Sequence, residues 1–238
     1  SDSSNRFSGH LDGQNHTLTV PEGGLPLLGY VKDAYVKDLN IYGPQIEGYG
    51  LVNNLEGVGL SGNAITIEGV TLKSGTKTLK SGLIGTYITT NSFAGCSGGF
   101  LVTIRNCVAE RGVVIGYTDE ESKIGTFAGR FNGTIEGCES YATVYGVDSV
   151  GGIVGNQDNS MASVKVTDCK FHGTVEASGE EAGGIIGSGY IGGWADNAMR
   201  PNISHCTVTG SVYGSNKVGG IQGGDSVVIQ TYARTPNE

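Results

Sequence analysis

Four cysteines are the most regularly spaced reactive side chains in the sequence. They are Cys107, Cys138, Cys169 and Cys206, at steps of 31, 31 and 37 residues. None belongs to a Cys-x-x-Cys pair of the kind that binds zinc. Steps of this length place the thiols on successive repeats, about 4.8 Å apart if the repeats are strands, which is too far for good disulfide geometry. We predict a buried ladder of reduced cysteines and no metal site.

An aromatic and polar segment near residue 190 has the composition of a sugar-binding loop. Its side chains are Tyr190, Trp194, Asp196 and Asn197, and they include the single tryptophan of the chain. Aromatic faces beside carboxylate and amide groups can recognise sugar rings. A loop that folds back over the core would have the same composition, and the sequence leaves both interpretations open. These four residues form the candidate ligand-binding site.

The sequence contains no constellation that predicts catalysis. Glu120 and Glu121, like Glu180 and Glu181, are adjacent acids, and neighbours along a chain tend to point apart. We interpret them as solvated charges in turns. Cys96 lies in a glycine-rich loop, and no histidine stands at a spacing that identifies it as a partner of this thiol. We predict no catalytic residue and no cofactor.

The cysteines belong to a larger frame that must position them. An apolar residue, two further residues and then cysteine or another apolar residue recur along the chain, preceded each time by an apolar pair and a glycine or asparagine. Self-similarity near 30 residues predicts a solenoid, in which each repeat packs only on its neighbours. The frame occupies residues 36–39, 67–70, 104–107, 135–138, 166–169 and 203–206.

Strands rather than helices fill this repeat. Short runs rich in Val, Ile and Thr are broken by Gly, Asn and Asp every 6 to 10 residues, which leaves no window for a helical period. Ile104 and Cys107 are three residues apart, so they can both point inward only if a corner separates them. The residue before each cysteine position suits a left-handed corner. These corner residues are Asp38, Gly69, Asn106, Gly137, Asp168 and His205.

The predicted fold class is therefore all-β, a right-handed parallel β-helix of about seven coils with three short strands each. The two longest departures from the period, Thr86–Val102 and Ser188–Asn202, are insertions between the first two strand positions. Insertions on one side of a solenoid commonly carry its function.

Length and composition favour one elongated domain spanning residues 1–238, with residues 1–6 expected to be a disordered leader or linker remnant. The net charge is −8 and the basic residues form no cluster, which argues against nucleic acid as a partner. No apolar run approaches the roughly 18 residues of a membrane span, so no membrane insertion is expected.

Several segments resemble the GLUG repeat of large bacterial surface proteins. They are residues 150–157, 203–212 and 218–221. The resemblance implies an extracellular module, attached to the cell wall or outer surface, within a longer polypeptide. It also implies an adhesin or spacer role, with host or environmental glycans or proteins as partners. The alternative is a carbohydrate-active β-helix enzyme, but of the polygalacturonase-type motifs only the His172-Gly173 pair is present.

Overall fold

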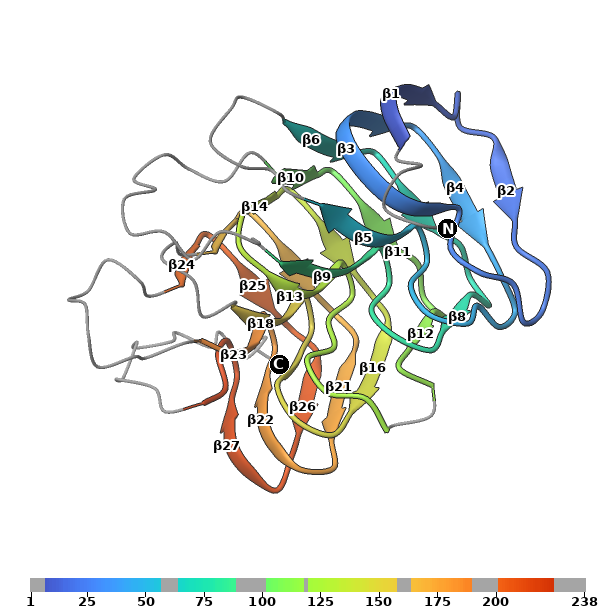
Figure 1. The fold of residues 1–238 in the computed structure, drawn as a ribbon. Coiled ribbons are helices and arrows are strands. Elements are labelled where there is room, and N and C mark those ends of the chain that lie inside the picture. The colour runs from blue at the N-terminus through green and yellow to red at the C-terminus, as the bar shows by residue number, and fades with distance from the viewer. Residues whose placement is uncertain are drawn as a thin grey trace, which may run out of the picture.

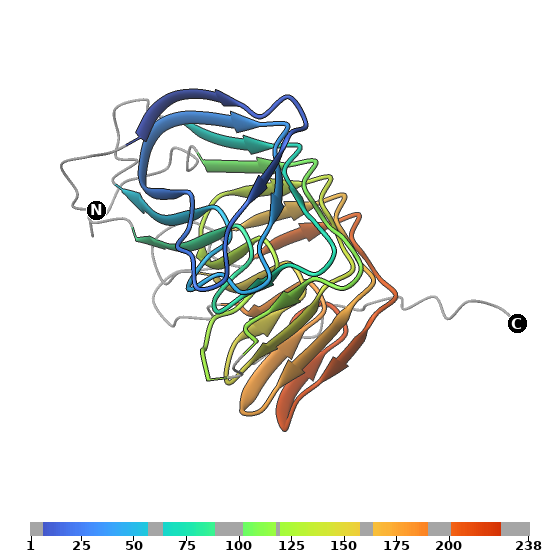
Figure 2. The same cartoon turned by 90° about the vertical axis from the view of Figure 1, so that its right-hand side faces the viewer.

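The chain is a parallel β-helix (Figure 1). Strands from successive turns of the chain pair in parallel and stack into continuous sheets, which confirms the predicted fold class. Figure 2 shows these strands side by side in order of colour, so each coil packs on the next. The computed structural model describes residues 7–56, 64–88, 102–117, 120–157, 164–189 and 201–224, with the side chains of 54–56 and 85–88 excepted.

The first sheet branches at one long strand, β3 (Leu28–Lys37). The first half of β3 pairs with β5 and its second half with β1 and β6, so the later coils form two ladders that diverge from β3. The upstream ladder continues through β5 (Val52–Glu56), β9 (Ile84–Ile88), β13 (Ala128–Phe131), β18 (Val154–Gln157) and β23 (Ile186–Ser188). The downstream ladder comprises β1 (Phe7–Asp12), β6 (Ile65–Glu68), β10 (Val102–Arg105), β14 (Thr134–Glu136), β19 (Lys165–Thr167) and β24 (Asn202–Ser204).

Three further sheets complete the coils. The second sheet contains β2 (Thr17–Thr19), β4 (Asn40–Tyr42), β7 (Thr71–Leu72), β11 (Val108–Ala109), β15 (Glu139–Ser140), β20 (Lys170–Phe171) and β25 (Thr207–Val208). The third contains β8 (Lys77–Thr78), β12 (Val114–Ile115), β16 (Thr143–Gly146), β21 (Thr174–Ala177) and β26 (Ser211–Tyr213). The fourth contains β17 (Val150–Gly151), β22 (Glu180–Gly183) and β27 (Asn216–Gly219).

The corner before each cysteine position is confirmed. The backbone there is left-handed, with φ of 51° at Asp38, 53° at Asn106, 54° at Asp168 and 52° at His205. Gly69 and Gly137 complete the series, both at 61°. Aspartate, asparagine and glycine tolerate this region better than branched residues do, so the amino-acid type and the bend coincide in each coil.

The core runs through the coils as stacked columns of inward side chains. Leu72, Ala109, Ser140 and Phe171 occupy equivalent positions in four consecutive coils of the second sheet and are fully buried. The Ser140 hydroxyl is satisfied by the Thr126 hydroxyl at 2.9 Å. Two small residues thus stand between two large ones, and large and small side chains in one column allow close packing.

Both predicted insertions leave the coil at the same place. Thr86–Val102 begins in β9 and ends at β10, and Ser188–Asn202 begins at the end of β23 and ends at β24. Their first strands lie on the upstream ladder and their last strands on the downstream ladder. The ends of the two insertions are therefore aligned along one side of the solenoid.

Candidate functional site

The predicted ligand-binding residues Tyr190, Trp194, Asp196 and Asn197 lie outside the described residues. The segment that contains them connects β23 with β24. Their assignment remains a prediction from the sequence. Cys96 lies outside the described residues as well.

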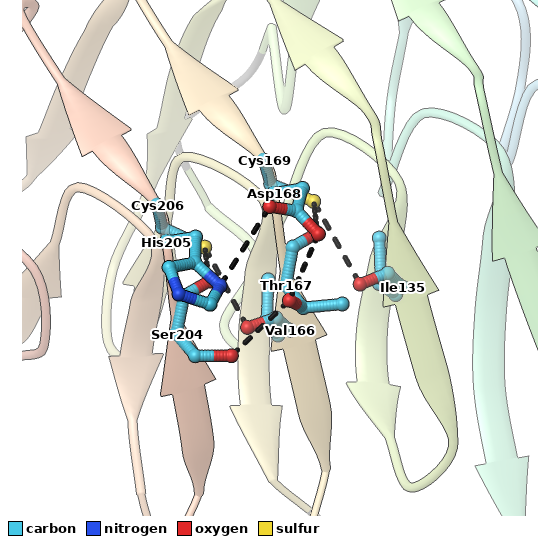
Figure 3. A network of polar contacts seen from close by, with 8 residues as sticks. All are labelled: Ile135, Val166, Thr167, Asp168, Cys169, Ser204, His205 and Cys206. Carbon is cyan, nitrogen blue, oxygen red and sulfur yellow. Dashed lines mark hydrogen bonds and ion pairs between the residues drawn. The ribbon is translucent and has the colours of Figure 1, made fainter.

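The four cysteines of the ladder are free thiols that point inward. Each thiol donates to a carbonyl oxygen of the preceding coil, as Cys169 does to Ile135 at 3.7 Å and Cys206 to Val166 at 3.5 Å (Figure 3). Burial, together with the neighbouring thiols, raises the pKa of Cys138 well above its ordinary value. A thiol held protonated in this way is a poor nucleophile and a poor metal ligand. Cys107, Cys138 and Cys169 are buried and Cys206 packs against the buried core, so the ladder is part of the core.

On the outside of the same corner, polar side chains of two coils contact one another. The Ser204 hydroxyl donates to Thr167 Oγ1 at 3.1 Å, and His205 Nδ1 lies 3.7 Å from an oxygen of Asp168 (Figure 3). The His205 and Asp168 side chains are 80% and 65% exposed. Solvent screens an ion pair this open, so it contributes little stability.

A cluster of polar and aromatic side chains lies on the outer face of the second sheet. We call it the Glu139 cluster; it consists of Glu139, Tyr141, His172, Thr209 and Arg111. Glu139 Oε1 accepts from the Tyr141 hydroxyl at 2.6 Å and lies 3.2 Å from His172 Nε2. The rings of Tyr141 and His172 stack at 4.7 Å and 21°. The other His172 nitrogen, Nδ1, lies 2.6 Å from Thr209 Oγ1.

The repeat explains why these residues meet. Tyr141 and His172 are 31 residues apart, the same step as Cys138 to Cys169, so they stand at equivalent positions in adjacent coils. The sequence did not reveal the contact between His172 and Glu139. The signal that could have revealed it is this shared step, applied to the outward positions as well as to the cysteines.

The hydrogen bonds of the Glu139 cluster work against acid or base catalysis. The bond from Tyr141 holds the pKa of Glu139 below its usual range, whereas a general acid requires a raised carboxyl pKa. The same bond raises the pKa of Tyr141, whereas a phenolate base requires a lowered one. The cluster is therefore better suited to holding side chains in place than to proton transfer.

Charged side chains elsewhere in the described structure also pair from coil to coil. Lys37 lies 2.9 Å from Asp12, and Arg105 lies 2.8 Å from Glu68. These four residues occupy consecutive positions of one outward column, in which positive and negative charges alternate. Wherever a carboxyl pKa in the described part of the chain is displaced, it is lowered. The groups are Asp12, Glu68, Glu110, Glu139 and Glu180.

Acid should remove the contribution of Glu68 to stability. Hydrogen bonds from Tyr35 and Arg105 lower its pKa, so the folded state favours the carboxylate. That contribution is complete above the ordinary glutamate pKa of about 4.3 and disappears as the pH falls through the lowered value. A Glu68→Gln variant should be less stable than the parent at neutral pH, and the difference should shrink in acid.

Urea denaturation of both proteins across this pH range measures the effect. Glu136→Gln is the matched control, because Glu136 stands next to Arg105 in the same column and its side chain makes no hydrogen bond or ion pair with another described residue. Glu136→Gln removes a carboxylate without breaking such a bond, so it should cost less stability at neutral pH than Glu68→Gln does. A Glu68→Gln difference that does not narrow in acid would contradict the assigned role.

Metal and membrane criteria give no further site. Among the described residues, no group of three His, Cys, Asp or Glu side chains is arranged to hold a metal ion. The same residues contain no helix with the length and apolar character to cross a membrane.

The class of protein defined by these observations is a parallel β-helix whose outward charges pair along the coils. No protein-family model and no curated protein matches the chain. A similar fold is found in the crystal structure of a putative immunoglobulin A1 protease from Bacteroides ovatus, at 16% sequence identity and a TM-score of 0.57. The match covers 87% of this chain and 68% of that one. At this identity the likeness concerns the fold.

Proposed function

We propose that the chain is a non-catalytic repeat module of a larger bacterial surface protein, a rigid spacer that also displays an adhesive surface. One observation carries the proposal: on several outward columns oppositely charged side chains of neighbouring coils pair, as in Asp12 with Lys37, Glu68 with Arg105 and Glu110 with Lys73. Such pairs stiffen the stack and lower the carboxyl pKa values. Glycoside hydrolysis would instead require one carboxyl group with a raised pKa near a second carboxylate.

Two resemblances agree with this role. The sequence is similar to GLUG repeats in three segments, and the fold is similar to that of a chain described as a putative immunoglobulin A1 protease. From the resemblance to GLUG repeats we propose an extracellular location, in the cell wall or on the outer surface, beside other domains of one polypeptide. Host or environmental glycans and proteins are the partners that fit such a module.

The absence of catalysis is tested by incubating the intact chain with polysaccharides of different charge. Released reducing ends report hydrolysis, and ultraviolet absorbance of unsaturated products reports lyase activity. We expect neither signal above a buffer control. Steady product release by the purified protein, reduced in a Glu139→Gln variant, would overturn the proposal in favour of a carbohydrate-active enzyme.

The adhesive part is tested on a glycan array with the parent and a Trp194→Ala variant. We expect the variant to lose binding to the glycans that the parent retains, because an aromatic face is the usual platform for a sugar ring. Tyr213→Ala is the control, since Tyr213 is an exposed aromatic of the third sheet, 58% accessible. Equal binding by the parent and the Trp194→Ala variant would show that Trp194 does not bind the glycan and would contradict the proposed site at residues 190–197.

A further inference from the structure

The outer face of the second sheet combines aromatic rings with cations. One outward column contains Lys73, Glu110, Tyr141, His172 and Thr209, one residue from each of five consecutive coils. The neighbouring column of the same strands contains Val108, Glu139, Lys170 and Thr207. These two columns, together with Arg111 over the Tyr141 ring, form an open face of the solenoid, which we call the second-sheet face.

Hydrogen bonds hold the rings of this face in fixed positions. Tyr141 is bound to Glu139, and His172 is held between Glu139 and Thr209. The Arg111 guanidinium lies 5.5 Å from the centre of the Tyr141 ring. Arginine over an aromatic face keeps its N–H groups free to bind a ligand at its edge. The face is therefore organised before any ligand arrives, which lowers the entropic cost of binding.

The second-sheet face has three cations, Lys73, Arg111 and Lys170, against two carboxylates, Glu110 and Glu139, so its net charge is slightly positive. Glu110 is paired with Lys73, and the Glu139 carboxylate is occupied by Tyr141 and His172. Arg111 and Lys170 are exposed and have no ion pair within 4 Å in the described part of the chain, although Lys170 stands opposite Glu139 and helps to lower its pKa. This excess of positive charge beside fixed rings contrasts with the net charge of −8 of the whole chain.

We infer that the second-sheet face binds an acidic carbohydrate chain through Arg111 and Lys170, with Tyr141 and His172 as its rigid floor. The arginine fork matches a carboxylate in a bidentate arrangement, and the Tyr141 hydroxyl oxygen can still accept a hydrogen bond from a sugar hydroxyl group. A nucleic acid is a poorer fit, because two cations neutralise few phosphates and the overall charge repels a polyanion of that density. The inference deepens the proposed adhesive role and rests on it.

The experiment measures binding of polygalacturonate, a carboxylated polymer, and of dextran, a neutral one, by isothermal titration calorimetry. We expect the parent to bind polygalacturonate, with affinity that falls as salt is added, and to bind dextran far more weakly. An Arg111→Gln, Lys170→Gln double variant should bind polygalacturonate at least about tenfold more weakly, since hydrogen bonds between charged groups are lost. Circular dichroism confirms that each variant is folded.

The matched control is Lys165→Gln. Lys165 belongs to the same coil as Lys170 and is exposed, but it lies on the first sheet. Its substitution removes one charge and should leave the affinity within about twofold of the parent. Equal loss in the control, no loss in the double variant, or no binding of polygalacturonate by the parent would each overturn the inference. Cleavage of the bound polymer would instead contradict the non-catalytic role, so the two failures are distinguishable.

Discussion

A Gly152→Ala protein is expected to lose about 3 kcal/mol of stability or more, near the upper end of what overpacking a core costs. A Cβ atom at this position would lie 2.1 Å from the carbonyl oxygen of Gly184 in the next coil and 2.6 Å from the ring of Phe171. The oxygen belongs to backbone, which cannot rotate away. The two coils would have to separate, and the hydrogen bond from Gly152 N to Gly183 O, 3.0 Å long, would weaken.

The same column supplies the control for this prediction. A Cβ at Gly184 would meet the oxygen of Gly220 at 2.2 Å, whereas a Cβ at Gly220, in the last described coil, would have no atom of the described residues within 4 Å. Gly220→Ala should therefore change the free energy of unfolding, measured by urea denaturation, by no more than a few tenths of a kcal/mol, the range of an exposed substitution. If Gly152→Ala proved as harmless as Gly220→Ala, the close stacking of the coils would be wrong.

A Leu72→Ala protein is expected to lose about 2–5 kcal/mol, the usual cost of truncating a fully buried leucine. Leu72 is completely inaccessible and packs between Ile41 of the preceding coil and Ala109 of the following one. Alanine already occupies the next position, so the cavity would have a small neighbour on that side and could not be filled by rotation of a larger side chain. Urea denaturation of the purified variant measures the loss.

Leu18→Ala is the matched comparison, because Leu18 begins the same inward column in the first described coil of the second sheet. Its side chain is partly buried and stacks on Ile41 alone. Less apolar area returns to water, so we expect about half the loss of Leu72→Ala or less. Equal losses at the two positions would show that Leu18 is as well packed as the interior, contrary to the structure.

Both predictions follow from the fact that a solenoid is stabilised by the contacts between neighbouring coils. Each coil bonds and packs with its two neighbours, so a defect in the middle disturbs two interfaces and a defect at an end disturbs one. The paired substitutions compare these situations with chemistry held constant. They also separate the two contributions to the stack, close approach of backbone at Gly152 and burial of side chains at Leu72.

The sequence by itself was enough to predict the coil and its corner. A left-handed φ is a property of single residues, so Asp38, Asn106 and Asp168 could be recognised from their amino-acid type and position. The inward positions followed from alternation over a few residues on each side of that corner. The reduced cysteine ladder followed from the constant step between repeats and is confirmed by its free, inward thiols.

The fourth sheet was not recognised from the sequence. The sequence predicted three strand segments per coil, and the described later coils add β17, β22 and β27 at the glycine pairs. A Cβ at Gly151 would lie 1.8 Å from the oxygen of Val154, so these glycines form a corner too tight for a side chain. Strands of two to four residues beside such a corner give no alternation long enough to identify.

The Glu139 cluster was decided by the tertiary structure. Nothing within a few residues of Glu139 or His172 indicates that they meet, because their contact depends on the register between two coils. Register is fixed by the whole inward pattern, in which Ser140 stands opposite Phe171, and the outward neighbours follow from it. Local backbone preferences therefore specify each bend and each inward side chain, whereas stacking of segments some 30 residues apart determines which outward side chains form a surface.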